Sequence, residues 1–521
     1  MKNRLWVIVM AGLLSYGWNF WGTSIYFLDE AKNAQCAAEM LETRDFFVPR
    51  FNGQFHDKPV LQYVFMMGAY QVFGINSFSA RLFSVLFGVL MLIVVFQFVK
   101  KLLGEKVAFY AALILAASLQ MSWQFRMAAP DPYLLFLLTL GMLSFFYGYQ
   151  SRRSTYLYVF YISIGLGFIA KGPIAYALPG LSVVVFLLLN RDFSWQRIVS
   201  LRAFEGIVLS LAIGLPWYVG TGLATKWEWP EYFFITHNIS RYTSTFEGHH
   251  GFPFDGVVIV IAALLPLSVF LPQAFFVGWK ERKQQPFLLF SISVFIAVIG
   301  FFFFSQTVLP SYPAPCMPFV AVLLGYFLVK MEEESGWQRF KPVFNAVVYM
   351  VISIALPVAA WIAFHKVPEL KQLSPGYSLV FVTASLGGVL GLWFIHQKKM
   401  SSAFYSYTAS FVVLLMLVFQ FPMPALDRLN PVTNSLALIE SYNKPIVHYR
   451  RINPAYVFNL HRIVPDLHNE EELDDFIREH GSVIVISAEK EWREVKRTDM
   501  KQVFEGRYLF EPPKAIVMIK E

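Results

Sequence analysis

Apolar residues recur along the chain in runs of about 18–20, separated by short clusters of charged residues. An α-helix needs a run of that length to cross the roughly 30 Å hydrocarbon core of a bilayer. The pattern therefore predicts a polytopic α-helical membrane protein with about 13 spans. We expect the spans at residues 5–22, 82–99, 107–125, 132–150, 155–169, 174–189, 203–220, 255–279, 286–304, 313–330, 343–364, 377–396 and 402–420.

Basic residues cluster in alternate loops, and this alternation predicts the orientation. Cytoplasmic loops carry the excess of lysine and arginine in membrane proteins. Lys2 and Arg4 precede the first apolar run, which no small-residue cleavage site follows, so we interpret it as a retained span. The N-terminus is therefore expected in the cytoplasm. The outward, periplasmic loops are expected at residues 23–81, 126–131, 170–173, 221–254, 305–312 and 365–376, with the tail after 421.

Two segments do not fit the spanning pattern. Residues 60–74 would reach only about 22 Å as a helix, so we interpret them as a helix in the membrane interface, inside the outward loop 23–81. In the tail, KPIVHY, SVIVIS and KAIVMIK predict strands, EELDDFIREHG predicts a helix closed by Gly481, and AEKEWREVKR predicts a second helix. The chain should therefore divide into a transmembrane domain, residues 1–420, and a small soluble α/β domain, residues 421–521.

Composition supports this interpretation. The 521 residues are 56% hydrophobic and 15% charged, whereas a soluble domain carries roughly 25% charged residues. We interpret the net charge of +8 as an orientation signal, so no nucleic-acid partner is expected. The two cysteines, Cys36 and Cys316, could form a bridge on the outward face, but we expect free buried thiols.

The first outward loop begins with two adjacent carboxylates. Asp29 and Glu30 directly follow the first span, where charged groups are costly unless they face water or a partner. Both are therefore catalytic candidates. Asp29 could instead only cap the helix that Ala34, Ala37 and Ala38 predict by their spacing.

The same loop ends with Lys58. A lysine at the membrane interface can extend its ammonium group merely to reach water. It can also bind a lipid-borne phosphate at headgroup level, as a hydrated point charge, and this is the functional interpretation of Lys58.

Four further outward loops add candidates. Asp131 precedes a proline and could start a helix, and Lys171, between two apolar segments, needs either water or an anion. Arg241 is a second phosphate candidate in a loop that also contains His237, and Tyr312 either binds a phosphate or sugar or belongs to an aromatic belt. Acids, cations and histidine thus gather on one side of the membrane, which predicts an outward active site at membrane depth.

Taken together, several segments resemble the GT-C glycosyltransferases of the protein O-mannosyltransferase and ArnT-like (lipid A aminoarabinose transferase) superfamily. The resemblance runs in order through the membrane part, at DEAKNAQCAAEML, FNGQFHDKPVLQY, AAPDPYL, GLGFIAKGPIAYALP, PWYV, HNISRY with HHG, and LPSYPAP. The tail resembles the periplasmic domain of ArnT only in position and size. The chain departs from the family pattern at Asn33, Gln35, Asp57 and Val308.

The resemblance implies an inverting transferase that moves a sugar from a polyprenyl (undecaprenyl) phosphate carrier to lipid A or another envelope acceptor. The reaction would take place on the periplasmic face of the bacterial inner membrane. Asp29 matches the catalytic or acceptor-positioning aspartate, and Asp131 matches a second outward aspartate. The donor-phosphate contacts and a lysine of the same cavity are matched by Lys58, Arg241, Tyr312 and Lys171. Asp57 and His237 match the positions that hold a zinc ion in the ArnT-like branch.

The expected chemistry needs cations more than it needs a cofactor. The carrier phosphate gains a second negative charge as the sugar leaves, and preorganised cations such as Lys58 and Arg241 would stabilise that charge. Asp29 would take the proton of an acceptor hydroxyl. Three alternatives stay open at this point: a protein O-mannosyltransferase-like enzyme, a lipid or sugar transporter, and a scaffold that only anchors the soluble tail.

Overall fold

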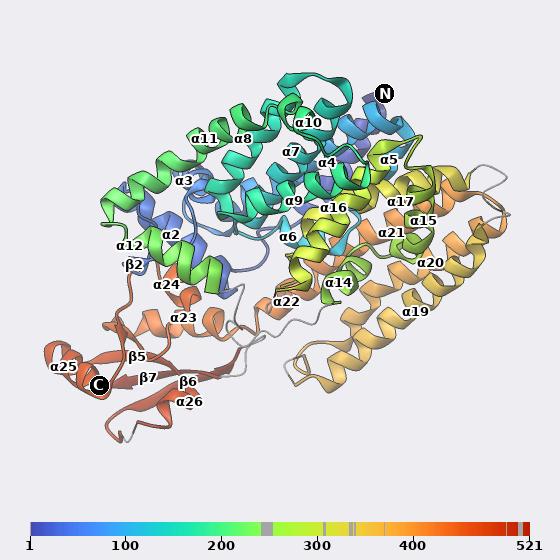
Figure 1. Ribbon diagram of the computed structural model, residues 1–521. Helices are drawn as coiled ribbons and strands as arrows, with labels where there is room; N and C mark the ends of the chain where they lie inside the picture. Colours follow the sequence, from blue (N-terminus) through green and yellow to red (C-terminus); the bar gives the residue numbers. More distant parts are fainter. Residues whose placement is uncertain are drawn as a thin grey trace.

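The computed structural model describes residues 2–240, 254–305, 309–332, 337, 340–368, 370–495, 497–508 and 514–520, and only the backbone of residues 2 and 237–240. Most of this chain forms a helical bundle, and the last part forms a small sheet domain (Figure 1). The N-terminus lies at the end of the bundle that is far from the sheet (Figure 1).

The first half of the bundle contains long apolar helices and several shorter ones. Its helices are α1 (Lys2–Gly12), η1 (Leu13–Gly17), α2 (Leu28–Thr43), α3 (Leu61–Phe73), α4 (Ser77–Leu103), α5 (Glu105–Ala116), α6 (Leu119–Gln124), α7 (Asp131–Ser151), α8 (Ser154–Lys171), α9 (Ile174–Leu189), α10 (Trp195–Ser200) and α11 (Ala203–Ala224).

The second half follows the same pattern. It contains α12 (Glu228–Glu231), η2 (Tyr232–Ser240), α14 (Asp255–Ala263), η3 (Leu267–Phe270), α15 (Leu271–Glu281), α16 (Pro286–Phe303), η4 (Ala314–Cys316), α17 (Met317–Met331), α19 (Pro342–Lys366), η5 (Pro375–Phe381), α20 (Val382–His396), α21 (Met400–Gln420) and α22 (Pro422–Asp427).

Among the described residues, 9 helices are long and apolar enough to cross a membrane, and each coincides with a predicted span. A tenth would be the pair Asp255–Ala263 and Leu267–Glu281, whose two parts are bent by 116°. The remaining expected spans, at 5–22, 107–125 and 174–189, form shorter helices. The polytopic helical fold is therefore confirmed, whereas the count of 13 stays a prediction.

The continuous span predicted at 107–125 is wrong, because the chain breaks after α5. Ser118 accepts a hydrogen bond from the amide of Met121 at 3.3 Å and thereby caps α6. Its hydroxyl donates to the carbonyl of Ala263 at 2.8 Å, which ties this break to the bent segment around α14. A serine that bonds to nearby backbone offers the chain an alternative to a continuous helix.

The first outward loop folds as α2, a short hairpin and α3. The hairpin pairs β1 (Arg50–Phe51) with β2 (Gln54–Phe55) in antiparallel register. The helix predicted over 60–74 is confirmed as α3. The capping role suggested for Asp29 is wrong: α2 begins at Leu28 with Phe27 as its N-cap, and no side chain caps it.

The tail forms a mixed five-stranded sheet with the order β4-β3-β5-β7-β6. The predicted strands are confirmed as β3 (Ile446–Tyr449), β5 (Val483–Ala488) and β7 (Lys514–Lys520), and the first predicted helix as α25 (Glu470–His480), which ends at Gly481. The second predicted helix is only α26 (Glu489–Trp492). The further elements are α23 (Pro431–Ser441), α24 (Pro454–Asn459), β4 (Asp466–Leu467) and β6 (Lys501–Arg507).

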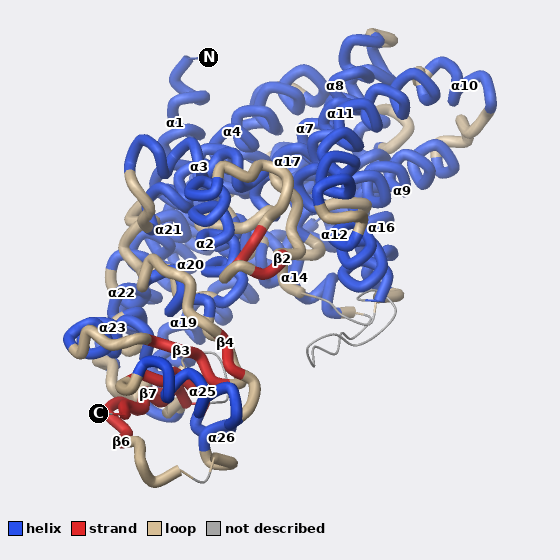
Figure 2. Tube along the Cα trace, turned by 90° about the vertical axis from the view of Figure 1, so that its left-hand side faces the viewer, coloured by secondary structure: helices blue, strands red, loops and turns tan. Residues whose placement is uncertain are grey.

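The sheet domain packs against the first outward loop, with which it shares an apolar core. Figure 2 shows the sheet at one end of the helical bundle. The side chain of Asn52 donates to the carbonyl of Val464 and accepts from its amide, both at 2.8 Å. Asn459 donates to the carbonyl of Ile25 at 3.1 Å. The first outward loop, residues 23–81 and hereafter loop one, is therefore held between the membrane helices and the sheet.

The two cysteines are confirmed as free and buried thiols. Cys36 lies in α2 and Cys316 at the end of η4, in two different apolar cores.

Candidate active site

A cavity of about 640 Å³ opens where loop one meets the ends of several helices. Most of its wall is apolar, with phenylalanines from η2 and α16 and aliphatic side chains from α7 and α9. The polar side chains that line it come from separate parts of the chain: Asp57, Lys58, Gln124, Asp131, Lys171, Ser305, Ser311 and Tyr312. Charged groups inside an apolar, membrane-level cavity are expensive to hold unless they serve a ligand or each other.

Loop one contributes an acid and a base side by side. The Lys58 ammonium forms an ion pair with Oδ2 of Asp57, and both side chains are largely buried. On the other side, Oδ1 of Asp57 lies 3.2 Å from Nδ1 of His56. Burial lowers the pKa of His56 from 6.5 to about 4, and the Asp57 carboxylate opposes this shift.

The bundle contributes a second acid–base pair. Lys171, the last residue of α8, donates to both carboxylate oxygens of Asp131, the first residue of α7, at 2.7 and 2.8 Å. The Lys171 ammonium lies 5.8 Å from the centre of the Tyr312 ring, which stacks on Phe302. The structure thus brings four of the candidate residues from the sequence into one cavity: Lys58, Lys171, Asp131 and Tyr312.

Asp29 and Glu30 are placed differently, although they are adjacent. Asp29 is exposed in the first turn of α2, and its charge raises the pKa of His56, but it is not among the residues that line the cavity. Glu30 is 0% exposed and lies against Arg81 of α4.

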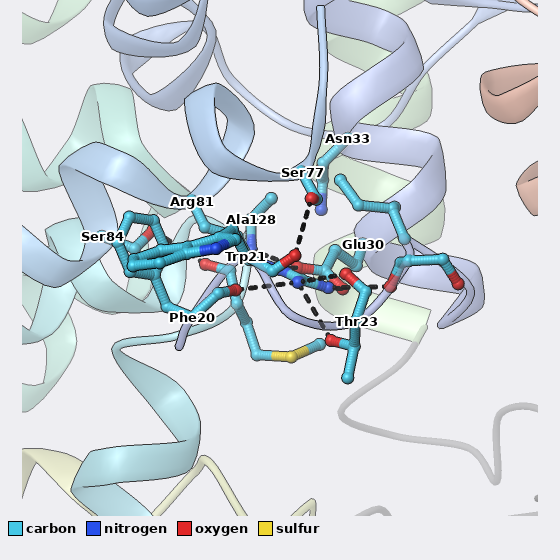
Figure 3. Close-up of polar contacts among 12 residues, drawn as sticks. Phe20, Trp21, Thr23, Glu30, Asn33, Ser77, Arg81, Ser84 and Ala128 are labelled. Atoms are coloured by element: carbon cyan, nitrogen blue, oxygen red, sulfur yellow. Dashed lines mark hydrogen bonds and ion pairs between the residues drawn. The ribbon is translucent and has the colours of Figure 1, made fainter. Parts of the chain in front are cut away.

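Hydrogen bonds also join the Glu30–Arg81 pair to neighbouring backbone groups (Figure 3). The two guanidinium–carboxylate bonds measure 2.7 and 2.8 Å. Arg81 also donates to the carbonyls of Phe20 and Thr23, and Glu30 accepts from the amide of Ala128 at 2.9 Å. This pair joins the segment after η1, α2, α4 and the loop before Asp131. A role in holding the site together therefore suits Glu30 better than the catalytic role expected from sequence.

Two predicted site residues, Arg241 and His237, cannot be placed relative to the cavity. Arg241 lies outside the described residues, and so does the side chain of His237. Among the described residues, no three histidine, cysteine or acidic side chains gather as metal ligands. The predicted zinc positions were Asp57 and His237, and only the side chain of Asp57 is among the described residues. A zinc site therefore stays a prediction.

Sequence reasoning missed several residues of this region. Gln124, Ser305 and Ser311 line the cavity, and a glutamine within an apolar run was a usable signal for the first. Asn33 and His56 form a buried contact behind the cavity. No local signal connected these two, because 23 residues separate them.

Comparison with known families matches part of the membrane domain. Residues 57–219 match the family model of dolichyl-phosphate-mannose-protein mannosyltransferases. The matched range begins at Asp57 and includes Lys58, Asp131 and Lys171.

Longer similarities are found among bacterial proteins. The chain is 27% identical over 402 residues to the undecaprenyl phosphate-alpha-4-amino-4-deoxy-L-arabinose arabinosyl transferase of Photorhabdus laumondii, covering 74% of this chain and 71% of that protein. It is 30% identical over 334 residues to an uncharacterized protein of Aquifex aeolicus, covering 63% of this chain and 74% of that protein.

A solved structure has the same fold. The crystal structure of ArnT from Cupriavidus metallidurans bound to undecaprenyl phosphate superposes with a TM-score of 0.81, covering 100% of this chain and 98% of that one. The sequence identity is 19%, so this similarity concerns the fold. It extends over both the helical bundle and the sheet domain.

Proposed function

Because the chain belongs to the ArnT-like GT-C glycosyltransferases, we propose that it transfers a sugar from undecaprenyl phosphate to lipid A or another envelope acceptor. The observation that carries the proposal is the convergence of Lys58, Lys171, Asp131 and Tyr312 on one cavity. These residues come from loop one, from two helix ends and from the segment before α17. The cavity wall is apolar enough to accept part of a polyprenyl chain.

The cavity charges suit a phosphodiester that becomes a phosphate dianion. When an acceptor oxygen attacks the sugar, the bond between the sugar and the phosphate breaks, and both electrons of that bond stay on the phosphate. Lys58 lines the cavity, and its ammonium group is paired with Asp57. Because an ammonium group has three N–H donors, it can bind a phosphate in the cavity while it keeps this pair. A cation that meets the leaving charge in an apolar site stabilises the transition state more than the ground state.

The acids would serve the acceptor and the second lysine. Asp29 is proposed as the group that takes the proton of an acceptor hydroxyl; an acceptor phosphate is already ionised and needs only positioning. Asp131 holds the Lys171 ammonium with two hydrogen bonds and thereby keeps it in the cavity. Tyr312 and Arg241 complete the proposed donor-phosphate contacts.

The proposed setting is the bacterial inner membrane, with the cavity and the sheet domain in the periplasm and the N-terminus in the cytoplasm. The basic clusters of the alternate loops support this orientation. A protein acceptor is the second candidate, because the family model that matches residues 57–219 describes protein mannosyltransferases.

The test is transfer by the purified full chain. With undecaprenyl phosphate carrying radiolabelled 4-amino-4-deoxy-L-arabinose and with lipid A, we expect label to move to lipid A. Lys58→Ala should lower the rate by about 10²–10³-fold, because a cation that meets the developing phosphate charge is lost.

Lys371→Ala is the matched control, since Lys371 is exposed and far from the cavity in sequence. Full turnover by Lys58→Ala would contradict the donor-phosphate role. Mass spectra of lipid A from a deletion strain would separate the acceptors: an unchanged lipid A with altered envelope proteins would support the protein acceptor instead.

A further inference from the structure

A buried polar cluster joins the helix that carries Asp29 to the segment that carries Asp57 and Lys58. The function proposed above assigns no task to it. Its members are Asn33, His56, Gln62 and Tyr63, all at most 5% exposed.

Asn33 is the centre of the cluster. It lies on α2, one turn after Asp29, and its amide nitrogen donates to the backbone carbonyl of Asp29 at 2.7 Å. Its amide oxygen accepts from Nε2 of Gln62 at 2.9 Å and from the hydroxyl of Tyr63 at 3.1 Å. Nε2 of His56 lies 3.2 Å from the same oxygen.

These contacts fix the direction of each group. The Asn33 nitrogen must face a carbonyl and its oxygen must face donors, so the amide cannot turn over without losing bonds at both ends. A carbonyl oxygen only accepts, so the His56 contact is a hydrogen bond in the tautomer that carries the ring proton on Nε2. The other ring nitrogen of His56 then faces Asp57, with Nδ1 3.2 Å from Oδ1.

The backbone of His56 is held as well. Its amide donates to the carbonyl of Pro49 at 2.9 Å, and its carbonyl accepts from the indole of the buried Trp229 at 2.6 Å. The next two residues, Asp57 and Lys58, line the cavity. A displacement of His56 would therefore be passed directly to the Lys58 ammonium group.

We propose that Asn33 is a positioning residue that sets the separation between Asp29 on the acceptor side and Lys58 on the donor side. This assignment rests on the proposed function. The groups that Asn33 serves lie on α2, on α3 and on the segment between β2 and α3, and both elements with a proposed role in catalysis are among them. Asn33 is also one of the positions at which the chain departs from the family pattern.

An amide that served packing alone would not need this arrangement. Within the described part of the chain, the Gln62 amide oxygen has no hydrogen-bond partner, so the bond to Asn33 is what orients the Gln62 side chain. Replacing Asn33 by leucine, which is similar in shape, would leave the Gln62 amide and the Tyr63 hydroxyl without their acceptor, remove the contact with His56 and free the loop-one segment to move.

The test compares Asn33→Leu with Asn345→Leu in the purified full chain. Asn345 of α19 is a matched control. It is a buried asparagine whose side-chain amide bonds to Gln273 and to the backbone of Val269. For Asn33→Leu we expect kcat to fall roughly 10- to 100-fold, as expected for a small misplacement of reacting groups, with both KM values within about 3-fold of wild type. Asn345→Leu should lower the thermal midpoint similarly but leave kcat within about 2-fold.

Two further measurements separate positioning from a general loss of structure. The His56→Leu and Asn33→Leu effects on kcat should not add in the double variant, because both break the same connection. Hydrogen exchange at residues 56–63 should be faster in Asn33→Leu and unchanged in Asn345→Leu.

The outcomes are distinct. A wild type that transfers no sugar contradicts the proposed function itself. An active wild type with equal kcat losses in Asn33→Leu and Asn345→Leu, additive effects with His56→Leu, or unchanged exchange at 56–63 contradicts only the role of Asn33.

Discussion

At the scale of single residues, the ion pair between Glu30 and Arg81 explains why two neighbouring acids have different environments. Glu30 is 0% exposed and bonds to Arg81 and to the amide of Ala128, whereas Asp29 is exposed. A buried ion pair adds little net stability by itself, but it is costly to break. The main contribution of this pair is to hold four segments together: the segment after η1, α2, α4 and the loop before Asp131.

Arg81→Met should therefore destabilise the chain strongly. The substitution leaves the Glu30 carboxylate buried without its partner, which costs about 3–5 kcal/mol. Unfolding by SDS in mixed micelles would measure the loss. The exposed pair Arg202–Glu205, at 3.0 Å, provides the control: Arg202→Met should cost less than about 1 kcal/mol.

A double variant, Glu30→Leu with Arg81→Met, should be less destabilised than Arg81→Met alone, because no uncompensated charge remains. A double variant that is less stable than the single one would contradict this account of Glu30.

Single residues were also where the sequence was informative about the cavity. Lys58, Lys171 and Asp131 were candidates because charged groups are rare at membrane depth without a function. The family resemblance implied their roles and that of Tyr312. Glu30 could not be distinguished from Asp29 in this way. Its partner Arg81 lies 51 residues later within an apolar helix, and only the fold brings the two together.

At the scale of secondary-structure elements, hydrophobic pattern predicted long helices and buried strands well. It missed β6, because an edge strand with the sequence KQVFEGR exposes most of its polar side chains and has no apolar alternation. It also joined α5 and α6 into one span, because the serine that separates them is surrounded by apolar residues. Breaks of this kind depend on tertiary hydrogen bonds, such as that from Ser118 to Ala263. The spacing of apolar residues along the sequence cannot predict such bonds.

Strand β3 gives the sheet domain a pH-dependent stability. His448 is 0% exposed, and within the described chain neither ring nitrogen has a hydrogen-bond partner. Burial lowers its pKa from 6.5 to about 3. Between these two values the unfolded chain binds a proton that the folded chain does not, so stability falls as the pH drops through this window and levels off below it.

The slope from this group should approach about 1.4 kcal/mol per pH unit in the middle of the window. Thermal unfolding of the full chain between pH 7 and pH 4 would measure it. His448→Leu should flatten the dependence, whereas substitution of the exposed His468 by leucine should not. Equal pH dependence in wild type and His448→Leu would exclude His448 as the source.

At the scale of the whole molecule, the sheet domain braces loop one from the side opposite the helices. Asn52 has a positive φ of 52° and forms two hydrogen bonds with the backbone of Val464. Glu39 accepts from the amides of Asn52 and Gly53 at 2.7 and 3.1 Å, which fixes the hairpin turn to α2. The hairpin is therefore a joint between the two domains.

Asn52→Gly should loosen this joint. Glycine adopts the positive φ without strain, so the substitution removes only the side-chain hydrogen bonds, worth about 1–3 kcal/mol for buried partners left unsatisfied. We expect faster hydrogen exchange around residues 460–467. Asn434→Gly, at an exposed position of α23, should leave that exchange unchanged; similar exchange in both variants would mean that the joint lies elsewhere.

The joint also has a consequence for biosynthesis. Asn52 and Val464 are 412 residues apart, so the ribosome finishes loop one long before it makes the partner that braces it. At about 5–20 residues per second, the delay is on the order of 20–80 s. During this interval the helices can enter the membrane while the hairpin still lacks its outer support. A newly inserted chain should therefore gain its finished cavity only near the end of translation.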